Sequence, residues 1–177
     1  VLIHAANSAG ALVHPGSRRD LVRLGIAMYG LSPGDDLTAE KLGLRPALTL
    51  RARVGHVKRV EAGSSISYGW RHTFDRATTV ATVPIGYADG VPRRLSSLGG
   101  EVLIGGRRHR MVGVVTMDQL MVDVGDAPVA VDDEVVLIGS QGGERIGVAE
   151  WSAMLGTIDY EVVCGISARV PRRSIGG

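Results

Sequence analysis

Two short polar clusters near the start of the chain combine residue types that bind anions. His4 and Ser8 follow one apolar run, and Arg23, Gly25 and Ile26 follow the next. Polar groups at the carboxyl ends of parallel strands gather at one edge, where loops and helix N-termini commonly hold phosphate. A serine hydroxyl donates to phosphate, and glycine lets an anion approach the backbone because it has no Cβ atom. Ordinary turns explain the same residues, since serine and glycine are common in loops.

Two tyrosines, Tyr68 and Tyr87, lie in polar segments that contain glycine. A tyrosine with a pKa of about 10 is a poor base at neutral pH unless a nearby cation stabilises its phenolate. Arg71 and His72 follow Tyr68 closely in the sequence. The alternative is a packing or hydrogen-bonding role, which is more common for a tyrosine in a loop.

Met117 and Asp118 separate two apolar runs and form a third polar centre. This centre offers either a backbone N–H to a carboxylate or a tight turn in which Asp118 bonds its own backbone. The sequence contains none of the common motifs for nucleotide phosphates, dinucleotides, zinc proteases or serine nucleophiles. Its five histidines are scattered, so no metal site is predicted.

The elements that must position these residues follow two patterns. Residues 1–45 alternate apolar runs with helix-like stretches, which predicts strands over 1–5 and 21–23, a helix over 9–14 and another helix beginning at Ile26. This alternation is typical of parallel β/α units. Because two such units cannot close a barrel or a sheet alone, we expect residues 1–45 to be the end of a larger parallel β/α architecture.

Residues 46–177 change to short apolar segments separated by glycine turns, which is typical of a β-barrel or sandwich. Gly105 and Gly106 indicate a two-residue hairpin. A helix is predicted over 148–155 and a final strand over 160–164. The other predicted strands cover residues 47–54, 56–60, 78–85, 101–104, 107–115, 120–124 and 134–138. The fold class is therefore mainly β, with a barrel-like carboxyl-terminal domain.

Composition excludes several classes of protein. A hydrophobic content of 45% suits a folded core, and a net charge of +2 is too small to argue for nucleic-acid binding. No apolar run is long enough to span a membrane. The lone Cys164 excludes an intrachain disulfide, so a reducing, cytoplasmic location is expected. Lysine is scarce: Lys41 and Lys58 are the only two.

Taken together and in order, these segments resemble the carboxyl-terminal half of the alanine racemases, fold-type III enzymes that use pyridoxal 5'-phosphate (PLP). The segments that carry the resemblance are residues 4–9, 22–30, 67–69, 84–90, 117–119 and 160–162. The resemblance implies a homodimer that interconverts L-alanine and D-alanine for peptidoglycan synthesis. It also implies that residues 1–45 are the last two units of an incomplete (β/α)8 barrel and that residues 46–177 are the carboxyl-terminal β domain. Each active site would be shared between an amino-terminal barrel and the carboxyl-terminal β domain of the other subunit.

The resemblance also implies a role for each candidate residue. Ser8 and the backbone of Gly25 and Ile26 would hold the PLP phosphate. Arg23 would face the pyridine nitrogen and keep it unprotonated, because arginine does not give up its proton.

Racemisation removes a proton from one face of the substrate and returns one to the other. By resemblance, Tyr68 would serve one face and the cofactor-bound lysine the other. Tyr87 would line the substrate entry, and Met117 would offer its backbone N–H to the substrate carboxylate.

Three departures from the family pattern limit these implications. The cofactor-bound lysine is expected in an earlier part of the barrel, and neither Lys41 nor Lys58 is assigned to that role, so this chain alone is expected to be inactive. The histidine behind Arg23 and an arginine beside the tyrosine are expected in that earlier part too. Ala168 stands where some relatives carry tyrosine, which suggests a pocket able to accept a larger substrate such as serine.

Three other functions compete with alanine racemisation. A serine racemase or another amino-acid racemase of the same family fits the same motifs. A basic amino-acid decarboxylase is disfavoured, because Tyr68 fits a proton donor to the second face. A non-catalytic β-barrel module that binds RNA would need aromatic positions and a basic stripe. Aromatic residues make up only 4% of the chain.

Overall fold

The computed structural model describes residues 1–34 and 36–175. The chain forms two compact units, unit 1 (Val1–Leu48) and unit 2 (Thr49–Gly177). Within the described residues, no helix is both long and apolar enough to cross a membrane.

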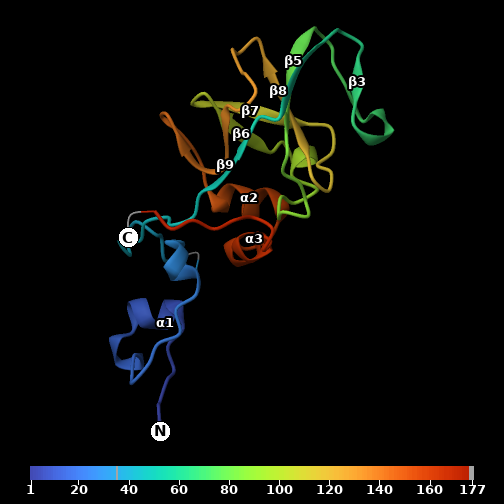
Figure 1. Cartoon of the computed structure of the whole chain (residues 1–177). Coiled ribbons are helices and arrows are strands. Elements are labelled where there is room, and N and C mark those ends of the chain that lie inside the picture. Colours follow the sequence, from blue (N-terminus) through green and yellow to red (C-terminus); the bar gives the residue numbers. More distant parts are fainter. Residues whose placement is uncertain (35, 176–177) are drawn as a thin grey trace. The chain divides into compact units, whose positions relative to one another are not determined.

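Unit 2 is built on one antiparallel sheet of eight strands (Figure 1). The neighbour order is β1-β9-β6-β7-β8-β5-β2, and β10 pairs with β9. The strands are β1 (Leu50–Arg53), β2 (His56–Val60), β5 (Thr78–Val83), β6 (Glu101–Ile104), β7 (Arg107–Val112), β8 (Leu120–Gly125), β9 (Glu134–Gln141) and β10 (Glu144–Ile146). This sheet confirms the mainly β prediction.

The two ends of the sheet meet through one continuous segment. Strands β1 and β2 are joined only by Val54 and Gly55. The Val54 N–H donates to the Asp133 carbonyl at 2.9 Å, and the Gly55 N–H donates to the Thr82 carbonyl at 2.8 Å. The segment therefore pairs with β9 in its first half and with β5 in its second. Since β9 and β5 belong to opposite ends of the strand order, the sheet curls into the barrel-like shape that the sequence predicts.

Alternating burial along the strands places the core on the inner face of the curled sheet. Every second residue of β8 is buried, beginning with Leu120, as expected when successive side chains point to opposite faces. Val102, Val122 and Val136 have no exposed surface. Gly105 and Gly106 both adopt positive φ, at 58° and 74°, the conformation that a two-residue type I′ hairpin requires.

Two helices complete unit 2. Helix α2 (Val148–Leu155) is confirmed where the sequence predicts it, with Trp151 buried and Gly156 left-handed after its last residue. The Gly147 N–H donates to Glu150 Oε1 at 2.9 Å, which satisfies a free donor at the start of the helix.

The strand predicted over residues 160–164 is wrong, because this segment lies in helix α3 (Asp159–Gly165). Asp159 and Glu161 occupy its first turn, where negative charge stabilises a helix. Val162 and Val163 are buried, and α3 packs against α2. A short apolar run does not distinguish a strand from a buried helix, so this tertiary packing decided the conformation.

Several predicted bounds also change. Strand β7 stops at Val112 rather than at residue 115, because Gly113 has a φ of 71°. Strand β1 begins at Leu50 rather than at residue 47. The short hairpin of β3 (Ser65–Ile66) and β4 (His72–Thr73), with the 3-10 turn η3 (Tyr68–Trp70) between them, is absent from the predicted elements.

Unit 1 contains little regular structure. The predicted strands over 1–5 and 21–23 are reduced to one parallel bridge between His4 and Leu21. Among the residues that the structure describes, this bridge is the only strand pairing of the two segments, whereas parallel strands are normally stabilised by several neighbours. The predicted first helix is confirmed as α1 (Ser8–Val13), and the 3-10 turn η1 (Pro15–Ser17) follows it. The helix predicted from Ile26 is only a 3-10 turn, η2 (Ile26–Tyr29).

Candidate functional site

Ser8, Gly25 and Ile26 form one backbone cradle in unit 1. Ser8 is buried, and its hydroxyl oxygen accepts the Gly25 N–H at 2.9 Å and the Ala27 N–H at 3.5 Å. A Cβ atom added to Gly25 would meet no other atom within 4 Å. The Ser8 hydroxyl hydrogen and the Ile26 N–H have no acceptor in the part of the chain that the structure describes. These donors suit an oxyanion.

Arg23 lies against His4, 19 residues earlier in the chain. The Arg23 guanidinium donates to His4 Nδ1 at 2.5 Å and to the Ala5 carbonyl at 3.4 Å. A guanidinium carries only donors, so the His4 Nδ1 must be the acceptor and its ring proton lies on Nε2. The expectation that the histidine behind Arg23 belongs to an earlier part of the barrel is therefore wrong. The bridge between His4 and Leu21 explains the pairing, because it brings the ends of the two segments together.

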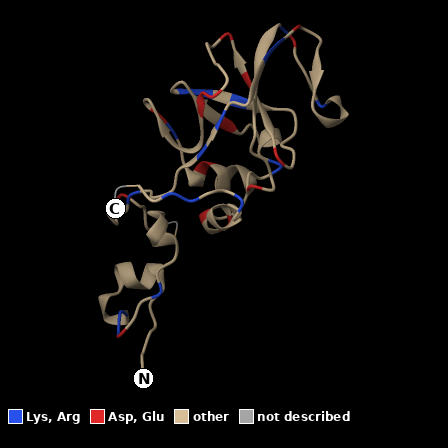
Figure 2. Ribbon diagram, viewed as in Figure 1, with Lys and Arg blue, Asp and Glu red and all other residues tan. Residues whose placement is uncertain are grey.

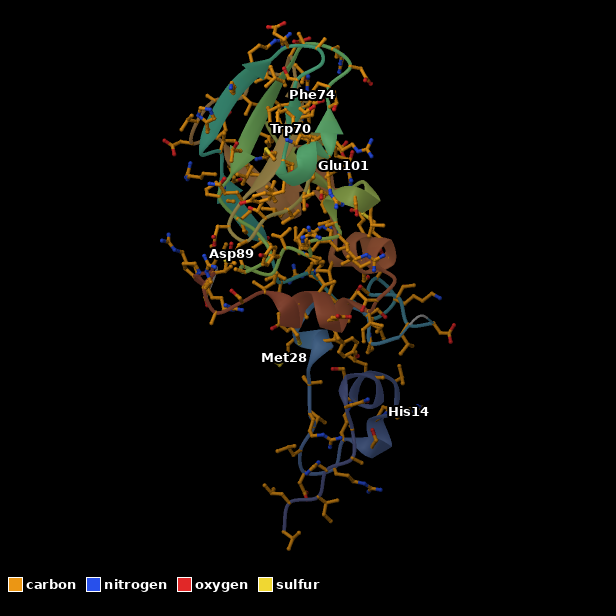
Figure 3. The ribbon with its side chains drawn as sticks, turned by 90° about the vertical axis from the view of Figure 1, so that its right-hand side faces the viewer. His14, Met28, Trp70, Phe74, Asp89 and Glu101 are labelled. Atoms are coloured by element: carbon orange, nitrogen blue, oxygen red, sulfur yellow. The ribbon has the colours of Figure 1, made fainter. Side chains whose placement is uncertain are left out.

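Tyr68 projects from the turn between β3 and β4 in unit 2. Tyr68 is 78% exposed and Trp70 is 76% exposed. The hairpin rests on Phe74, which is buried with Val80, and the His72 ring packs edge-on against Phe74 at 4.6 Å. In Figure 3, Trp70 and Phe74 lie toward one end of unit 2, and Asp89 lies toward the other. Packing on Phe74 therefore holds the turn in place, while Tyr68 is exposed to solvent.

Ser67 fixes the backbone immediately before Tyr68. Its φ of 74° is unusual for a residue with a side chain and costs free energy. The Ser67 hydroxyl accepts the Val114 N–H at 2.9 Å. A Cβ atom at Gly113 would lie only 2.7 Å from the Ser67 Cβ. The close approach of Gly113 and the hydrogen bond to Val114 thus hold Ser67 in a strained conformation.

The loops that contain Tyr87 and Met117 pack directly on each other. The Tyr87 N–H donates to the Thr116 carbonyl at 2.9 Å, and the Ala88 N–H donates to the Met117 carbonyl at 3.0 Å. Gly86 permits this contact, because a Cβ atom there would lie 2.3 Å from the Thr116 oxygen. Within the described residues, the Met117 N–H has no acceptor. Tyr87 is 43% exposed and Met117 is 52% exposed.

Arg169 joins these loops to the segment after α3. Its guanidinium lies 3.3 Å from Asp89 Oδ1 and donates to Asp118 Oδ1 at 2.7 Å. The hydrogen bond to Asp118 and the charge of Asp89 raise the pKa of Arg169. Asp118 therefore binds a distant arginine, and none of its recorded bonds is to its own backbone. Sequence reasoning missed Arg169, although it neighbours Ala168, which lies exposed in the same turn.

The predicted site residues therefore form local groups. Ser8, Gly25 and Ile26 share one cradle, and Tyr87 and Met117 lie in adjoining loops. Residues 47–174 match the family described as "Alanine racemase, C-terminal domain", and residues 1–33 match "Alanine racemase, N-terminal domain". The chain belongs to the alanine racemase family. The order of the two matches assigns it to the carboxyl-terminal portion of that family's sequence.

Individual relatives agree with this assignment. The alanine racemase of Symbiobacterium thermophilum is 58% identical over 170 residues, which are 96% of this chain and 45% of that relative. The crystal structure of alanine racemase from E. faecalis is 42% identical, with a TM-score of 0.89 over 98% of this chain and 46% of that one. The crystal structure of the Bacillus anthracis enzyme with bound L-Ala-P is 44% identical, with a TM-score of 0.89 over 99% and 45%. The chain thus spans about half the length of the racemases that it matches.

Proposed function

We propose that the complete protein carrying this chain is a PLP-dependent alanine racemase that interconverts L-alanine and D-alanine. It would supply D-alanine for peptidoglycan and work in the cytoplasm. The family membership of the chain supports this proposal, and the cradle of Ser8, Gly25 and Ile26 is the observation that carries it, because its unpaired donors suit the phosphate of PLP.

In this proposal Ser8 binds the phosphate through its hydroxyl and Ile26 through its backbone N–H. Gly25 leaves the approach to the backbone open, since it has no side chain to obstruct the phosphate. The Ser8 hydroxyl oxygen already accepts the Gly25 N–H, so its remaining hydrogen is free to point to an anion. When bound, PLP withdraws electron density from the substrate Cα, which makes its proton removable.

Arg23 is proposed to face the pyridine nitrogen. Its hydrogen bond to His4 restricts the guanidinium to one orientation. Because arginine remains protonated, it would donate a hydrogen bond to the ring nitrogen without transferring a proton. The pair of His4 and Arg23 would therefore restrain the electron-withdrawing power of the cofactor and disfavour side reactions.

Tyr68 is proposed as the acid–base group for one face of the substrate. It would act across a homodimer, in the active site completed by the other subunit, while the cofactor-bound lysine serves the opposite face. The exposure of Tyr68 supports a role outside its own fold. Met117 would donate its free N–H to the substrate carboxylate, and Tyr87 would line the entry. Inactivity of the 177-residue chain by itself stays a prediction.

A Tyr68→Phe variant of the complete protein tests this function. We expect a loss of racemisation of about 10²-fold or more, because the hydroxyl that carries the proton is removed. Binding of PLP, followed by its absorption spectrum, should be unchanged. Tyr160→Phe is the matched control, since Tyr160 is 40% exposed and lies on α3. Equal activity of Tyr68→Phe and Tyr160→Phe would contradict the proposal.

Serine is a second candidate substrate, and Ala168 is the observation that favours it. The residue is exposed in the turn beside Arg169 and carries only a methyl group. A small side chain here leaves room for the hydroxymethyl group of serine. Comparison of kcat/KM for L-alanine and L-serine decides between them. A strong preference for alanine that Ala168→Tyr leaves unchanged would eliminate serine racemisation.

A further inference from the structure

A pocket of about 460 Å³ on unit 2 is lined by a concentration of positive charge. Arg71, Arg93, Arg94 and Arg110 line it together with His72, and the described lining includes no acidic residue. Its volume falls in the range of small-molecule sites, about 300–1,000 Å³. None of the residues proposed above for PLP or alanine lines this pocket.

Three separate segments bring the four guanidinium groups together. Arg71 follows η3, Arg93 and Arg94 precede the 3-10 turn η4 (Ser96–Leu98), and Arg110 lies on β7. Figure 2 shows the basic residues of β7 in blue. Within the described part of the chain, none of these four side chains has a recorded ion pair or hydrogen bond. In contrast, Arg108 on the same strand has three carboxylate partners.

Two acidic residues are paired with Arg110 in the sheet, and both have hydrogen-bond partners elsewhere. Glu101 and Asp123 are the residues paired with Arg110 on the neighbouring strands. The Glu101 carboxylate accepts Arg108 at 3.0 Å. Asp123 Oδ1 accepts the Thr78 hydroxyl at 2.5 Å and the Gly125 N–H at 3.0 Å. In the part of the chain that the structure describes, neither carboxylate forms an ion pair with Arg110.

Hydroxyl groups and apolar side chains complete the pocket. Ser96 is more than nine-tenths buried, lines the pocket and has no recorded hydrogen bond from its hydroxyl to a described residue. The Ser97 hydroxyl donates to the Arg94 carbonyl at 2.8 Å, which fixes the turn that carries Arg94 and Ser96. Met111 and Val112 supply buried apolar surface. The four arginines are themselves exposed, so an anion from solution can reach their guanidinium groups and form charge-assisted hydrogen bonds with them.

We infer that this pocket binds a small multivalent oxyanion, with phosphate or carboxylate groups held by the forked donors of the arginines. Each guanidinium can bind such a group with two parallel hydrogen bonds. Like charges brought together repel, and an oxyanion offsets that repulsion while it pairs the free donors. Gly113 and Val114 line the pocket and also hold Ser67. The anion site therefore adjoins the turn that presents Tyr68.

Calorimetric titration of the complete protein with inorganic phosphate, and separately with malonate, tests the inference at low ionic strength. We expect saturable binding that the double variant Arg94→Gln/Arg110→Gln weakens about tenfold or more, because charged hydrogen bonds are lost. The control is Arg76→Gln, which removes one positive charge, where the double variant removes two, from an exposed residue of unit 2 outside the pocket. Its affinity for phosphate should change less than about twofold.

Chemical labelling of the unaltered protein avoids any dependence on the folding of the variants. Phenylglyoxal modifies exposed arginines, and mass spectrometry reads the extent of modification at each residue. Phosphate should protect Arg71, Arg93, Arg94 and Arg110 but not Arg76. Absence of binding, equal weakening by Arg76→Gln, or equal protection of Arg76 would overturn the inference. Preferential binding of an oligonucleotide over phosphate and malonate would also overturn it. Because none of these measurements uses racemisation, their failure is distinct from failure of the proposed function.

Discussion

Gly86 offers a sharp test of how the Met117 loop is positioned. In Gly86→Ala, the added Cβ atom would lie 2.3 Å from the Thr116 carbonyl oxygen and 2.4 Å from that of Met117. Both atoms belong to the backbone, so no side-chain rotation relieves the contact. To reach even 3.0 Å from Thr116, the two loops must separate by roughly 0.7 Å. That displacement also stretches the hydrogen bond from the Tyr87 N–H to Thr116.

The expected cost of Gly86→Ala is about 1–3 kcal/mol in the free energy of unfolding, the usual range for overpacking. If Met117 binds the substrate carboxylate, kcat/KM should fall by about tenfold to 10²-fold, since a displacement near 1 Å is enough to misalign a bound substrate. The two quantities are measured by urea denaturation followed by circular dichroism and by steady-state racemisation of L-alanine.

Gly143→Ala is the matched control. Gly143 has no positive φ, and its added Cβ would meet nothing within 4 Å. Its free energy of unfolding should stay equal or rise by up to about 1 kcal/mol, because alanine restricts the unfolded chain. Indistinguishable stabilities for Gly86→Ala and Gly143→Ala would refute the packing argument. If Gly86→Ala is destabilised but keeps its full kcat/KM, the packing argument stands and only the proposed role of Met117 in substrate binding is refuted.

Three further perturbations follow from local contacts. Burial alone would raise the pKa of Glu150, but its hydrogen bonds, above all from Arg108, hold it below its usual range. The ionised Glu150 therefore stabilises the folded state above its unfolded pKa of about 4.3, and this stabilisation is lost as the pH falls through its folded pKa. In Glu150→Gln, the free energy of unfolding should depend less on pH in this acidic range. Burial lowers the pKa of His109, so stability should decline as pH falls below about 6.5, and His109→Gln should remove this decline in urea titrations at pH 5 and 7. Ser67→Ala leaves the Val114 N–H without its acceptor and should cost about 1 kcal/mol, with a larger fall in kcat than rise in KM; an unchanged kcat would contradict its positioning role.

Local signals in the sequence were sufficient to predict much of the sheet. The hairpin between β6 and β7 depends on two adjacent residues, Gly105 and Gly106, whose positive φ angles are easy only for glycine. Helix α2 could also be predicted from the sequence, because its apolar spacing and the following Gly156 are local features of the helix. In contrast, α3 was misassigned because its conformation depends on packing against α2.

For the candidate site too, some features could be predicted from the sequence and others depend on tertiary structure. The order of short motifs determined the family and identified Ser8, Arg23, Tyr68 and Met117 as candidates. These motifs require only residue identity and spacing along the chain. Their assignment to the alanine racemase family agrees with the matches over residues 47–174 and 1–33. Their individual roles in PLP and substrate binding stay predictions.

Only the tertiary structure decided which side chains meet. Arg23 contacts His4 across 19 residues, and Arg169 contacts Asp118 across 51. The four arginines of the anion pocket come from three segments whose proximity depends on strand order and register. The sequence specifies which residues are charged. Whether two opposite charges form an ion pair depends on the distance between them in space, and the curled sheet sets that distance, not their spacing along the chain. For that reason Glu101 forms an ion pair with Arg108, whereas Arg110, two residues later on the same strand, has no ion pair in the described residues.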